Sequence, residues 1–315
     1  MISGGKKRTS KSKKAVAISV SAVLIAIFLV LNIACGIFAD YVTAFLCGYG
    51  ADSEEMTAAR QESAALADQI VGEGIVMVQN ENDTLPLSKT EDARVNVFGW
   101  SSTQWVYGGS GSGQVQQPGD EAEPVGILEA LESAGIEYNS ELTDMYRGYL
   151  AERPYASTGA LNSWNYQFSR LYEPSIDDTR YYSQSLLSNA EAYSDTAIVV
   201  IGRVSGESND QPKVQYKGAF DRAAHDNGTD DKDTTRTYLE ISTEEEALLE
   251  YVGAHYDKVV VLINALNTFE LGFMETIEGL DACLIVGGTG WTGATAIPKV
   301  LYGDLSPSGH VVDTY

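Results

Sequence analysis

The stretch "AIVVIGRVSGESND", residues 197–210, joins an uninterrupted apolar run to a Gly-Glu-Ser turn. Short apolar runs bounded by turn residues are typical of strands that are buried on both faces of a parallel sheet. In open α/β sheets, binding sites lie beyond the carboxyl ends of such strands. Glu207, on the glycine turn just past this strand, is therefore either a catalytic or ligand-binding group or a solvated loop acid.

Strand and helix signals alternate along most of the chain. Four near-continuous apolar runs have the character of central strands: "VNVFGW" (95–100), "TAIVVIGR" (196–203), "KVVVLINA" (258–265) and "ACLIVGG" (282–288). A fifth run, "GIVMVQN" (74–80), is also strand-like. Helical patterns cover residues 53–71, 123–135, 143–152, 242–256, 269–277 and 292–303. The alternation predicts an α/β fold: an open, mostly parallel α/β sandwich of about six strands with helices on both faces.

Two long segments, 153–189 and 211–237, interrupt this alternation. Long insertions at strand ends are either binding loops or surface decoration, and both interpretations remain open for these two. The second contains "HDNGTDDKDT" (225–234), which lacks the residue spacing of a calcium-binding loop. Because Asp, Asn and Gly are ordinary turn formers, this acidic run is interpreted as a solvated loop.

The N-terminal region carries a long uncharged apolar segment, "AVAISVSAVLIAIFLVLNIACGIF", residues 15–38. A helix of this length spans the hydrocarbon core of a bilayer. Six basic residues precede it, and positive charge stays on the cytoplasmic side. We therefore expect a cytoplasmic segment (1–14), a transmembrane helix (15–38), a linker (39–56) and an extracytoplasmic domain (57–315). The alternative is a cleaved signal peptide, although these have shorter apolar cores.

Composition narrows the classes of partner. The chain has 21 basic and 44 acidic residues, and residues 1–38 hold six of the basic ones and none of the acidic ones. The strongly acidic remainder repels nucleic acid and anionic membrane surfaces. Three cysteines (35, 47 and 283) and three histidines (225, 255 and 310) show no metal-ligand spacing and no disulfide framework. The sequence predicts neither a metal nor a cofactor.

The glycine-rich stretch "YGGSGSGQ", residues 107–114, follows one of the apolar runs. Gly108 and Gly113 have the spacing of a phosphate-binding loop, but Gln114 stands where that loop requires lysine. A G-x-S-x-G nucleophile turn also fails, because Ser112 occupies the place of its second glycine. The stretch is therefore interpreted as a small-residue loop that lets the backbone approach a neighbouring segment or a ligand closely.

Several blocks in order resemble the α/β-sandwich domain of glycoside hydrolase family 3, over residues 57–315. They include "VNVFGW" followed by "YGGSGSG", "VVIGRVSGESND" and "CLIVGGTGWTGATAIPKVLYGDLSPSG". The resemblance implies a retaining glycosidase in which a barrel domain carries an Asp nucleophile and the sandwich lends the acid/base. Glu207 matches that acid/base position, and Gly206 and Asp210 are in register, but Ser208 replaces the usual second glycine. No barrel precedes the sandwich, so the resemblance implies one after Tyr315.

The resemblance leads us to expect a membrane-anchored, β-glucosidase-like enzyme that acts on terminal β-linked sugars of oligosaccharides or β-glycosides. Glu207 is the expected catalytic residue, with Asp221 or Asp226 as alternatives, and Gly109, Ser110 and Asp210 are expected to contact substrate. Four aromatic residues are candidates for stacking on a sugar: Trp105, Tyr107, Trp164 and Tyr166. A non-catalytic sugar-binding or sensor protein is the alternative, and a nucleotide-binding module is the weakest.

Overall fold

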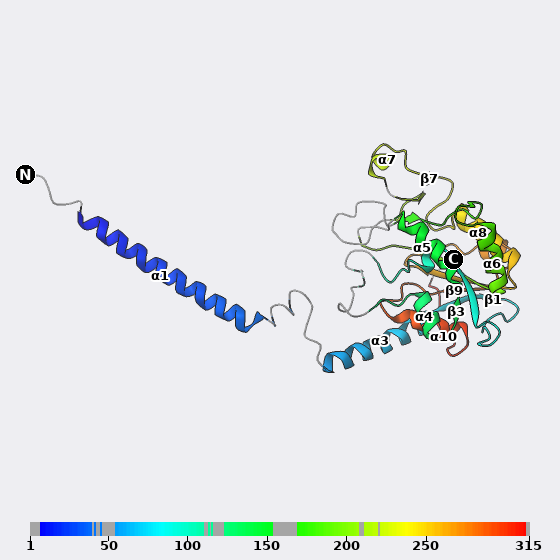
Figure 1. Ribbon diagram of the computed structural model, residues 1–315, viewed down its shortest axis with the longest axis horizontal. Helices are drawn as coiled ribbons and strands as arrows, with labels where there is room; N and C mark the ends of the chain where they lie inside the picture. The colour runs from blue at the N-terminus through cyan, green and yellow to red at the C-terminus, as the bar shows by residue number, and fades with distance from the viewer. Residues whose placement is uncertain are drawn as a thin grey trace, which may run out of the picture. The chain divides into compact units, whose positions relative to one another are not determined.

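The computed structural model describes residues 7–39, 41, 45, 54–109, 113, 115, 123–153, 169–207, 211–219 and 221–312 (Figure 1). The chain divides into two compact units, residues 1–59 and residues 60–315.

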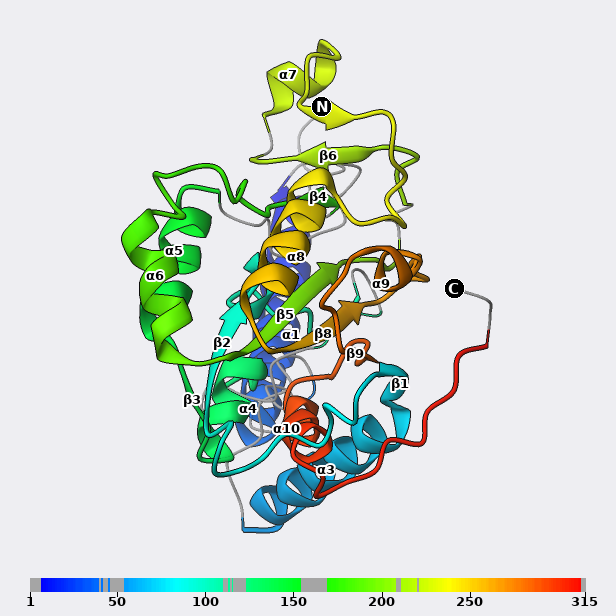
Figure 2. The same cartoon turned by 90° about the vertical axis from the view of Figure 1, so that its right-hand side faces the viewer.

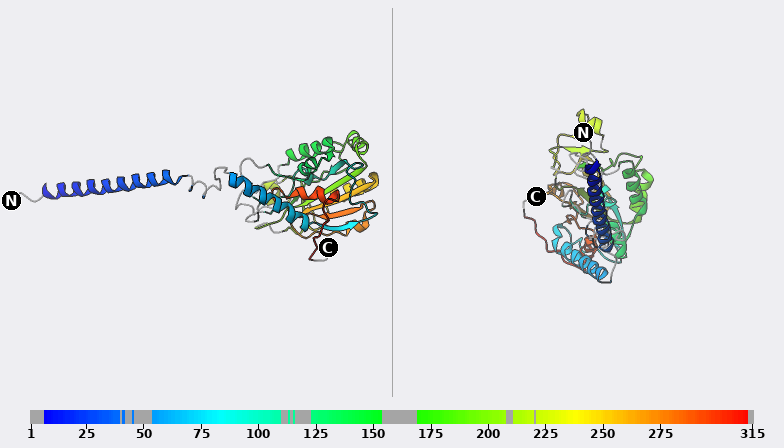
Figure 3. Two further views of the ribbon diagram at one scale, coloured as in Figure 1. Left: turned by 90° about the horizontal axis from the view of Figure 1, so that it is seen from below. Right: turned by 90° about the vertical axis from the view of Figure 1, so that its left-hand side faces the viewer.

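The first unit is built on α1 (Lys7–Ile37), which Figure 3 shows as one uninterrupted helix. Its stretch Lys14–Ile37 has 24 residues, a mean hydropathy of 2.7 and no buried side chains. Within the described part of the chain, it is the one helix long and apolar enough to cross a membrane, a criterion that signal sequences also meet. The predicted apolar helix over 15–38 is thus present, while its membrane role and orientation stay predictions.

The second unit contains a six-stranded sheet in the order β1-β9-β8-β5-β2-β3. The strands are β1 (Val76–Asn80), β2 (Arg94–Phe98), β3 (Glu137–Tyr138), β5 (Thr196–Arg203), β8 (Lys258–Ala265) and β9 (Ala282–Ile285). Only β1 runs antiparallel to its neighbour in this sheet. The prediction is confirmed: the sheet is mostly parallel, and the four apolar runs form its four inner strands.

Helices cover both faces of the sheet because inner strands alternate their side chains between two apolar clusters. On β5, Val199 and Ile201 face one cluster while Ile198 and Val200 face the other, and all four side chains are fully buried. The first cluster takes in α5 (Ser140–Ala151), α6 (Gln184–Tyr193), α8 (Thr243–His255) and α9 (Phe273–Thr276). The second takes in α4 (Ile127–Ser133) and α10 (Ala296–Leu301).

The helix boundaries follow local signals. Ser242 and Glu245 fit the sequence pattern of a capping box, and both of its hydrogen bonds are present at the start of α8, at 3.1 and 2.8 Å. Helix α3 (Glu54–Gly74) matches the predicted 53–71 segment. The predicted helix over 269–277 is wrong in extent, since α9 covers only Phe273–Thr276 and begins after Gly272. Residues 293–295 form a short 3₁₀ turn before α10.

The two long segments, 153–189 and 211–237, contain regular structure that the sequence pattern did not indicate. Residues 184–189 open α6, whose cap Ser183 accepts a hydrogen bond from the Leu186 amide. A second, three-stranded sheet joins β4 (Arg170–Leu171), β6 (Gln215–Lys217) and β7 (Lys232–Asp233), next to the short α7 (Arg222–Asp226) (Figure 2). Its strands are too short for a period-two pattern in the sequence, and a buried Arg170–Asp230 ion pair of 2.8 Å ties it together.

Candidate functional site

The candidate site lies at the carboxyl ends of the inner strands. The chain passes from β2 to β3 on one side, then returns to place β5 on the other side of β2. In open α/β sheets, the crevice for a ligand forms at such a reversal of direction, outside the carboxyl ends of the two strands. The loops that leave β2 and β5, residues 99–109 and 204–207, are therefore the ones whose positions decide the site.

The loop after β2 turns at once over the end of β5. Gly99 has a φ of +91°, and a Cβ there would lie 2.1 Å from the carbonyl oxygen of Val200. Gly202 on β5 makes room for the next turn, because a Cβ on it would lie 2.2 Å from Ser101 Oγ. These two glycines allow the 3₁₀ turn η1 (Trp100–Ser102) to sit directly on β5.

Asn264, near the end of β8, fixes the middle of the loop. Its Nδ2 donates to the carbonyl oxygens of Val106, at 3.0 Å, and Gly287, at 2.7 Å, and its Oδ1 accepts from the Val106 amide at 2.8 Å. The side chain is fully buried, so these bonds are shielded from water. Asn264 therefore joins the loop after β2 to the ends of both β8 and β9.

The far part of the loop lies against the segment that follows β9. Trp105 Nε1 donates to Thr289 Oγ1 at 2.9 Å, and the Gly290 amide donates to the Tyr107 carbonyl at 2.8 Å. The rings of Tyr107 and Trp291 lie 5.3 Å apart. Burial, with the Glu129 carboxylate adding to it, raises the pKa of Tyr107 to about 12. Tyr107 is therefore a neutral hydrogen-bonding group at physiological pH.

Gly109 brings the loops after β2 and β5 into contact. A Cβ on Gly109 would lie 3.1 Å from the carbonyl oxygen of Ser205 and 3.5 Å from Gly206 Cα. Its amide donates to the carbonyl of Gly113 at 3.1 Å. The predicted close approach of this loop is present, and the neighbour is the turn that carries Glu207. Contact of Gly109 with a substrate stays a prediction.

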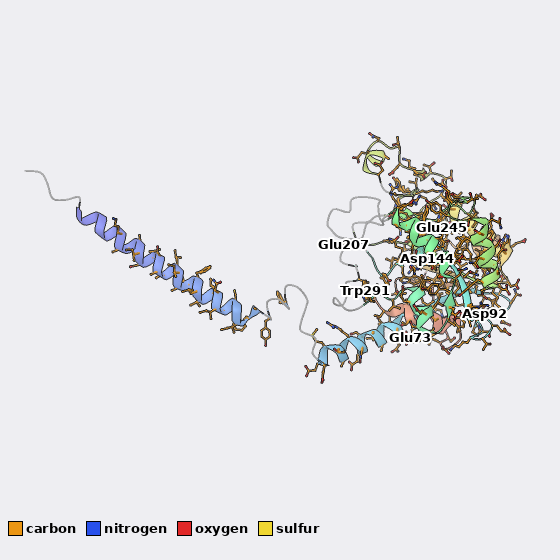
Figure 4. The ribbon with its side chains drawn as sticks, in the orientation of Figure 1. Glu73, Asp92, Asp144, Glu207, Glu245 and Trp291 are labelled. Atoms are coloured by element: carbon orange, nitrogen blue, oxygen red, sulfur yellow. The ribbon has the colours of Figure 1, made fainter. Side chains whose placement is uncertain are left out.

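Glu207 is exposed and directly follows Gly206, past the carboxyl end of β5. Figure 4 places Glu207 and Trp291 on one side of the domain and Asp92 toward the opposite side. Ser110 and Asp210, the other two predicted substrate contacts, lie outside the described residues, as does the departing residue Ser208. The structure therefore gives the site one described carboxylate from the prediction, on an accessible turn.

The structure gives different positions to the other predicted site residues, which are the two alternative acids and the aromatic candidates. Asp221 accepts hydrogen bonds from the amides of Ala223, at 2.7 Å, and Ala224, at 3.2 Å, so it caps α7. Asp226 ends the same helix and is exposed. Among the aromatic residues, Trp105 is buried and bonded to Thr289, whereas Trp164 and Tyr166 lie outside the described residues.

Sequence reasoning missed two buried charged residues at this edge. Arg203, the last residue of β5, binds both carboxylate oxygens of Glu245, at 2.7 and 2.6 Å. Burial alone would lower the pKa of this guanidinium, but the Glu245 carboxylate holds it above its usual range. The strand end from which Glu207 projects is therefore firmly anchored. The only sequence signal was an arginine that ends an apolar run.

Glu173 is the second of these residues, and it lies beneath the start of the loop after β2. Its Oε2 accepts from the Trp100 amide at 2.9 Å, and its Oε1 accepts from the hydroxyls of Tyr182, at 2.9 Å, and Tyr146, at 3.1 Å. Burial raises the pKa of the carboxyl to about 8, against these hydrogen bonds and with the charge of Glu245 adding to the rise. No pattern in the sequence marked it.

The same edge also holds a pocket of about 390 Å³ at the ends of β8 and β9. Its walls are mostly apolar, and Asn267, Thr268 and Gly288 supply its polar groups. Within the described ranges, no cluster of three or more His, Cys, Asp or Glu side chains is placed to hold a metal ion.

Comparison with known proteins gives consistent matches. The family model described as "Glycosyl hydrolase family 3 C-terminal domain" matches residues 75–315. A β-glucosidase of Ruminococcus albus is 31% identical over 248 residues, which cover 79% of this chain and 22% of that protein. Beta-glucosidase A of Butyrivibrio fibrisolvens is 26% identical over 275 residues, 84% of this chain and 30% of that protein.

Solved structures show the same fold. A β-glucosidase from Paenibacillus barengoltzii superposes with a TM-score of 0.59 at 27% identity, over 78% of this chain and 23% of that one. Beta-glucosidase 3B from Thermotoga neapolitana, in complex with glucose, superposes with a TM-score of 0.58 at 23% identity, over 78% and 30%. The chain thus spans less than a third of the length of these relatives.

Proposed function

Because the chain belongs to glycosyl hydrolase family 3, whose C-terminal domain it contains, we propose that it supplies the acid/base half of a β-glucosidase-like active site. The observation that carries this proposal is the position of Glu207. It is an exposed carboxylate on a turn past β5, beside the point where Gly109 meets Ser205 and Gly206. The edge that holds it is the one where ligands bind in open α/β sheets.

A retaining glycosidase needs two carboxyl groups about 5 to 5.5 Å apart on either side of the scissile bond. In the proposed reaction, Glu207 protonates the glycosidic oxygen as its bond to the anomeric carbon breaks. An aspartate of a barrel domain, which we expect elsewhere in the full protein, attacks that carbon and forms a glycosyl-enzyme. Glu207, now a carboxylate, then takes a proton from water, and the water attacks the anomeric carbon and releases the aspartate.

The surroundings of Glu207 fit a group that must work in both protonation states. Its turn is exposed, so the pKa rise required of a general acid would come from burial against the sugar and the partner domain. The strand behind it ends in the buried Arg203–Glu245 pair, which fixes the last residue of β5. The substrate proposed is a β-glycoside or oligosaccharide with a terminal β-linked sugar, contacted by the loop that contains Gly109.

We also propose that α1 anchors the protein in a membrane, with the basic residues before it on the cytoplasmic side and the second unit outside. The support is the 24-residue apolar stretch of α1 and the cluster of lysines that precedes it. Protease added to intact cells is expected to remove the second unit. Protection of that unit until the cells are lysed would contradict this orientation, and loss of α1 from the mature protein would indicate a signal peptide.

The experiment for the acid/base role uses the full-length protein with Glu207→Ala and Glu207→Gln, and Asp226→Asn as a control. The turnover rate on an unactivated β-linked disaccharide should fall by roughly 10² to 10⁴ for both Glu207 variants, since general acid/base help is lost. Asp226→Asn should keep its rate, because this exposed acid lies on α7. Azide should restore part of the rate of Glu207→Ala on activated aryl glycosides, where protonation of the leaving group matters little.

Nearly full activity of Glu207→Ala on the disaccharide would show that another residue is the acid/base. Sugar binding without turnover by the wild-type protein would instead favour the alternative of a sugar-binding or sensor protein.

A further inference from the structure

A buried cluster of one carboxyl and two phenols lies under the root of the loop after β2. The Glu173 cluster consists of Glu173, Tyr146 from α5 and Tyr182, and each of these side chains is almost completely buried. The two tyrosine hydroxyls hydrogen-bond to Glu173 Oε1 and also to each other. The carboxyl and hydroxyl groups of the cluster thus find their hydrogen-bond partners in one another and in the loop above them.

The cluster holds the first two peptide groups of the loop. The Trp100 amide donates to Glu173 Oε2 at 2.9 Å, and the Gly99 amide donates to the Tyr146 hydroxyl at 2.8 Å. The first amides of a helical turn have no partner within that turn, so they require acceptors from elsewhere. The ring of Trp100 also packs edge-on against Tyr172, with 5.4 Å between ring centroids. The Glu173 cluster therefore sets where η1 begins and in which direction it leaves β2.

From this root the loop runs to the proposed site over further supports, which include the hydrogen bond from Trp105 Nε1 to Thr289 Oγ1. Asn264 holds it at Val106, and the Gly290 amide holds it at Tyr107. Gly109 then lies within contact distance of Ser205 and Gly206, next to Glu207. Asn264 and Gly290 hold the far end of the loop, and the Glu173 cluster holds the near end. The loop that ends at Gly109 is thus held at two ends, of which the Glu173 cluster is one.

A carboxyl group is a costly way to support a turn, since burial without a cation strongly disfavours its charged form. An apolar residue at this position would leave the Trp100 amide buried without an acceptor. The carboxyl group supplies acceptors in two directions at once, to the loop on one oxygen and to two phenols on the other. Such a fork fixes the orientation of a turn, which a single acceptor does not.

We propose that Glu173 is a positioning residue of the proposed glycosidase site. Through the Trp100 amide and the Tyr146 hydroxyl, it fixes the loop that carries Gly109 beside the turn of Glu207. The inference rests on the proposed function for its meaning, but the placement of the loop can be measured without turnover. Glu173 does not touch the reacting atoms in this account.

The test uses the full-length protein in detergent with Glu173→Ala, Glu173→Gln and Tyr146→Phe, and Tyr256→Phe as a matched control. The buried hydroxyl of Tyr256 has no hydrogen-bond partner within the described part of the chain, so its loss should change little. Glu173→Ala should raise KM for an aryl β-glucoside about tenfold, because the loop no longer holds the sugar in place, and should change kcat less than about threefold.

Glu173→Gln should restore KM to within about threefold of the wild type. Its amide oxygen can accept from the Trp100 amide while its nitrogen donates to the tyrosine oxygens. Tyr146→Phe should fall between Glu173→Ala and the wild type. It loses the bonds to the Gly99 amide, the Glu173 carboxyl and the Tyr182 hydroxyl, but the Trp100 amide keeps its acceptor. An unchanged KM in Glu173→Ala, with kcat reduced in proportion to the folded fraction, would reduce Glu173 to a structural residue and overturn the inference.

A second readout needs no turnover and separates this inference from the proposed function. Acrylamide should quench tryptophan fluorescence more strongly in Glu173→Ala than in the wild type, because freeing the root of the loop exposes the buried Trp105. Glu173→Gln and Tyr256→Phe should be quenched like the wild type. Equal quenching in all four proteins would overturn the positioning role. Increased quenching in a protein that shows no glycosidase activity would support it while refuting the proposed reaction.

Discussion

The two ends of the same sheet each bury a carboxyl group, and they treat it in opposite ways. At the amino ends of the strands, Asp92 accepts from Lys258 Nζ at 2.8 and 2.9 Å, from Thr196 Oγ1 at 2.7 Å and from the Ser88 amide at 2.8 Å. Burial alone would raise the pKa of Asp92, but these hydrogen bonds and the charge of Lys258 hold it below its usual range. Asp92 is thus a paired charge that stabilises the fold.

At the carboxyl ends, the donors that the described residues offer to the buried Glu173 carboxyl are two phenols and one amide, and no cation is among them. Its pKa is raised to about 8, chiefly by burial. Figure 4 shows the exposed Glu207 on the side opposite Asp92. The difference teaches that pairing follows the task of the group and not the end of the sheet. Asp92 and, at the carboxyl ends, Glu245 are paired with Lys258 and Arg203, whereas Glu173 accepts the amide that begins the loop after β2.

The largest expected effect that tests the contrast between Asp92 and Glu173 is the pH dependence of the free energy of unfolding. Because the folded-state pKa of Glu173 is about 8 and its ordinary value is 4.5, the folded protein holds the proton more tightly than the unfolded chain. The contribution of Glu173 to the free energy of unfolding is therefore fully present at pH below about 4.5 and is lost as pH rises through about 8. We expect the free energy of unfolding to fall by on the order of 5 kcal/mol over that range.

The measurement is urea unfolding of the full-length protein in detergent between pH 5 and pH 9, for the wild type and Glu173→Gln. The amide does not titrate, so the variant should lose most of this pH dependence. The groups that face the carboxyl are the hydroxyls of Tyr146 and Tyr182 and, through its charge, Glu245, which is paired with Arg203. Parallel pH curves for the two proteins would show that the proton of Glu173 does not distinguish the two ends of the sheet.

The second effect concerns the Asp92–Lys258 ion pair at the amino ends of the strands. Lys258→Ala leaves the buried Asp92 carboxylate without its cation, and we expect it to lower the free energy of unfolding at pH 7 by about 2 kcal/mol. The ammonium group is partly exposed, which keeps this below the cost for a fully buried pair. Because the pKa of Asp92 is lowered in the folded state, the loss should shrink as pH falls through that pKa.

Lys89→Ala is the matched control for Lys258→Ala, since Lys89 pairs with Asp304 at 2.6 Å where both side chains are about half exposed. Its effect should stay below about 1 kcal/mol. Equal losses for the two lysines would contradict the view that the amino end depends on a desolvated charge pair.

The smallest effect compares one hydroxyl from each end. Thr196→Val removes the donor to Asp92 without changing the shape of the side chain, and we expect a loss of about 1 kcal/mol. Ser102→Ala, in η1, removes a buried hydroxyl that has no hydrogen-bond partner within the described ranges, and it should be close to neutral. Thermal unfolding of the two variants gives the comparison directly, and a larger loss in Ser102→Ala would reverse it.

The parts of the fold that the sequence predicted are those that depend on local pattern. The four inner strands are long apolar runs because both of their faces are buried, and such runs can be recognised in the sequence alone. The strands β3, β4 and β7 have two residues each, so no periodicity can reveal them. The capping box at Ser242 was visible because both of its partners lie within one turn.

The residues of the candidate site also fall into those that the sequence indicated and one that it did not. Glu207 was singled out because it sits on a turn next to an apolar run, where the sequence itself marks a strand end, whereas its predicted role and that of Gly109 came from the family resemblance. Glu173 was missed because its partners come from Trp100, Tyr146 and Tyr182, which are up to 73 residues away in the chain. A buried polar contact of this kind has no signature until the fold brings its members together.

The side chain of Asn264 has a consequence for how the domain opens. Its amide group exchanges a donor and an acceptor with the peptide groups of Val106, as a backbone partner in a ladder would. These hydrogen bonds attach the loop to the sheet in the way that the ladder bonds of a neighbouring strand would, although Val106 belongs to no regular element. The Val106 amide should therefore exchange its hydrogen for deuterium as slowly as the amides of β8, and only when the sheet itself opens.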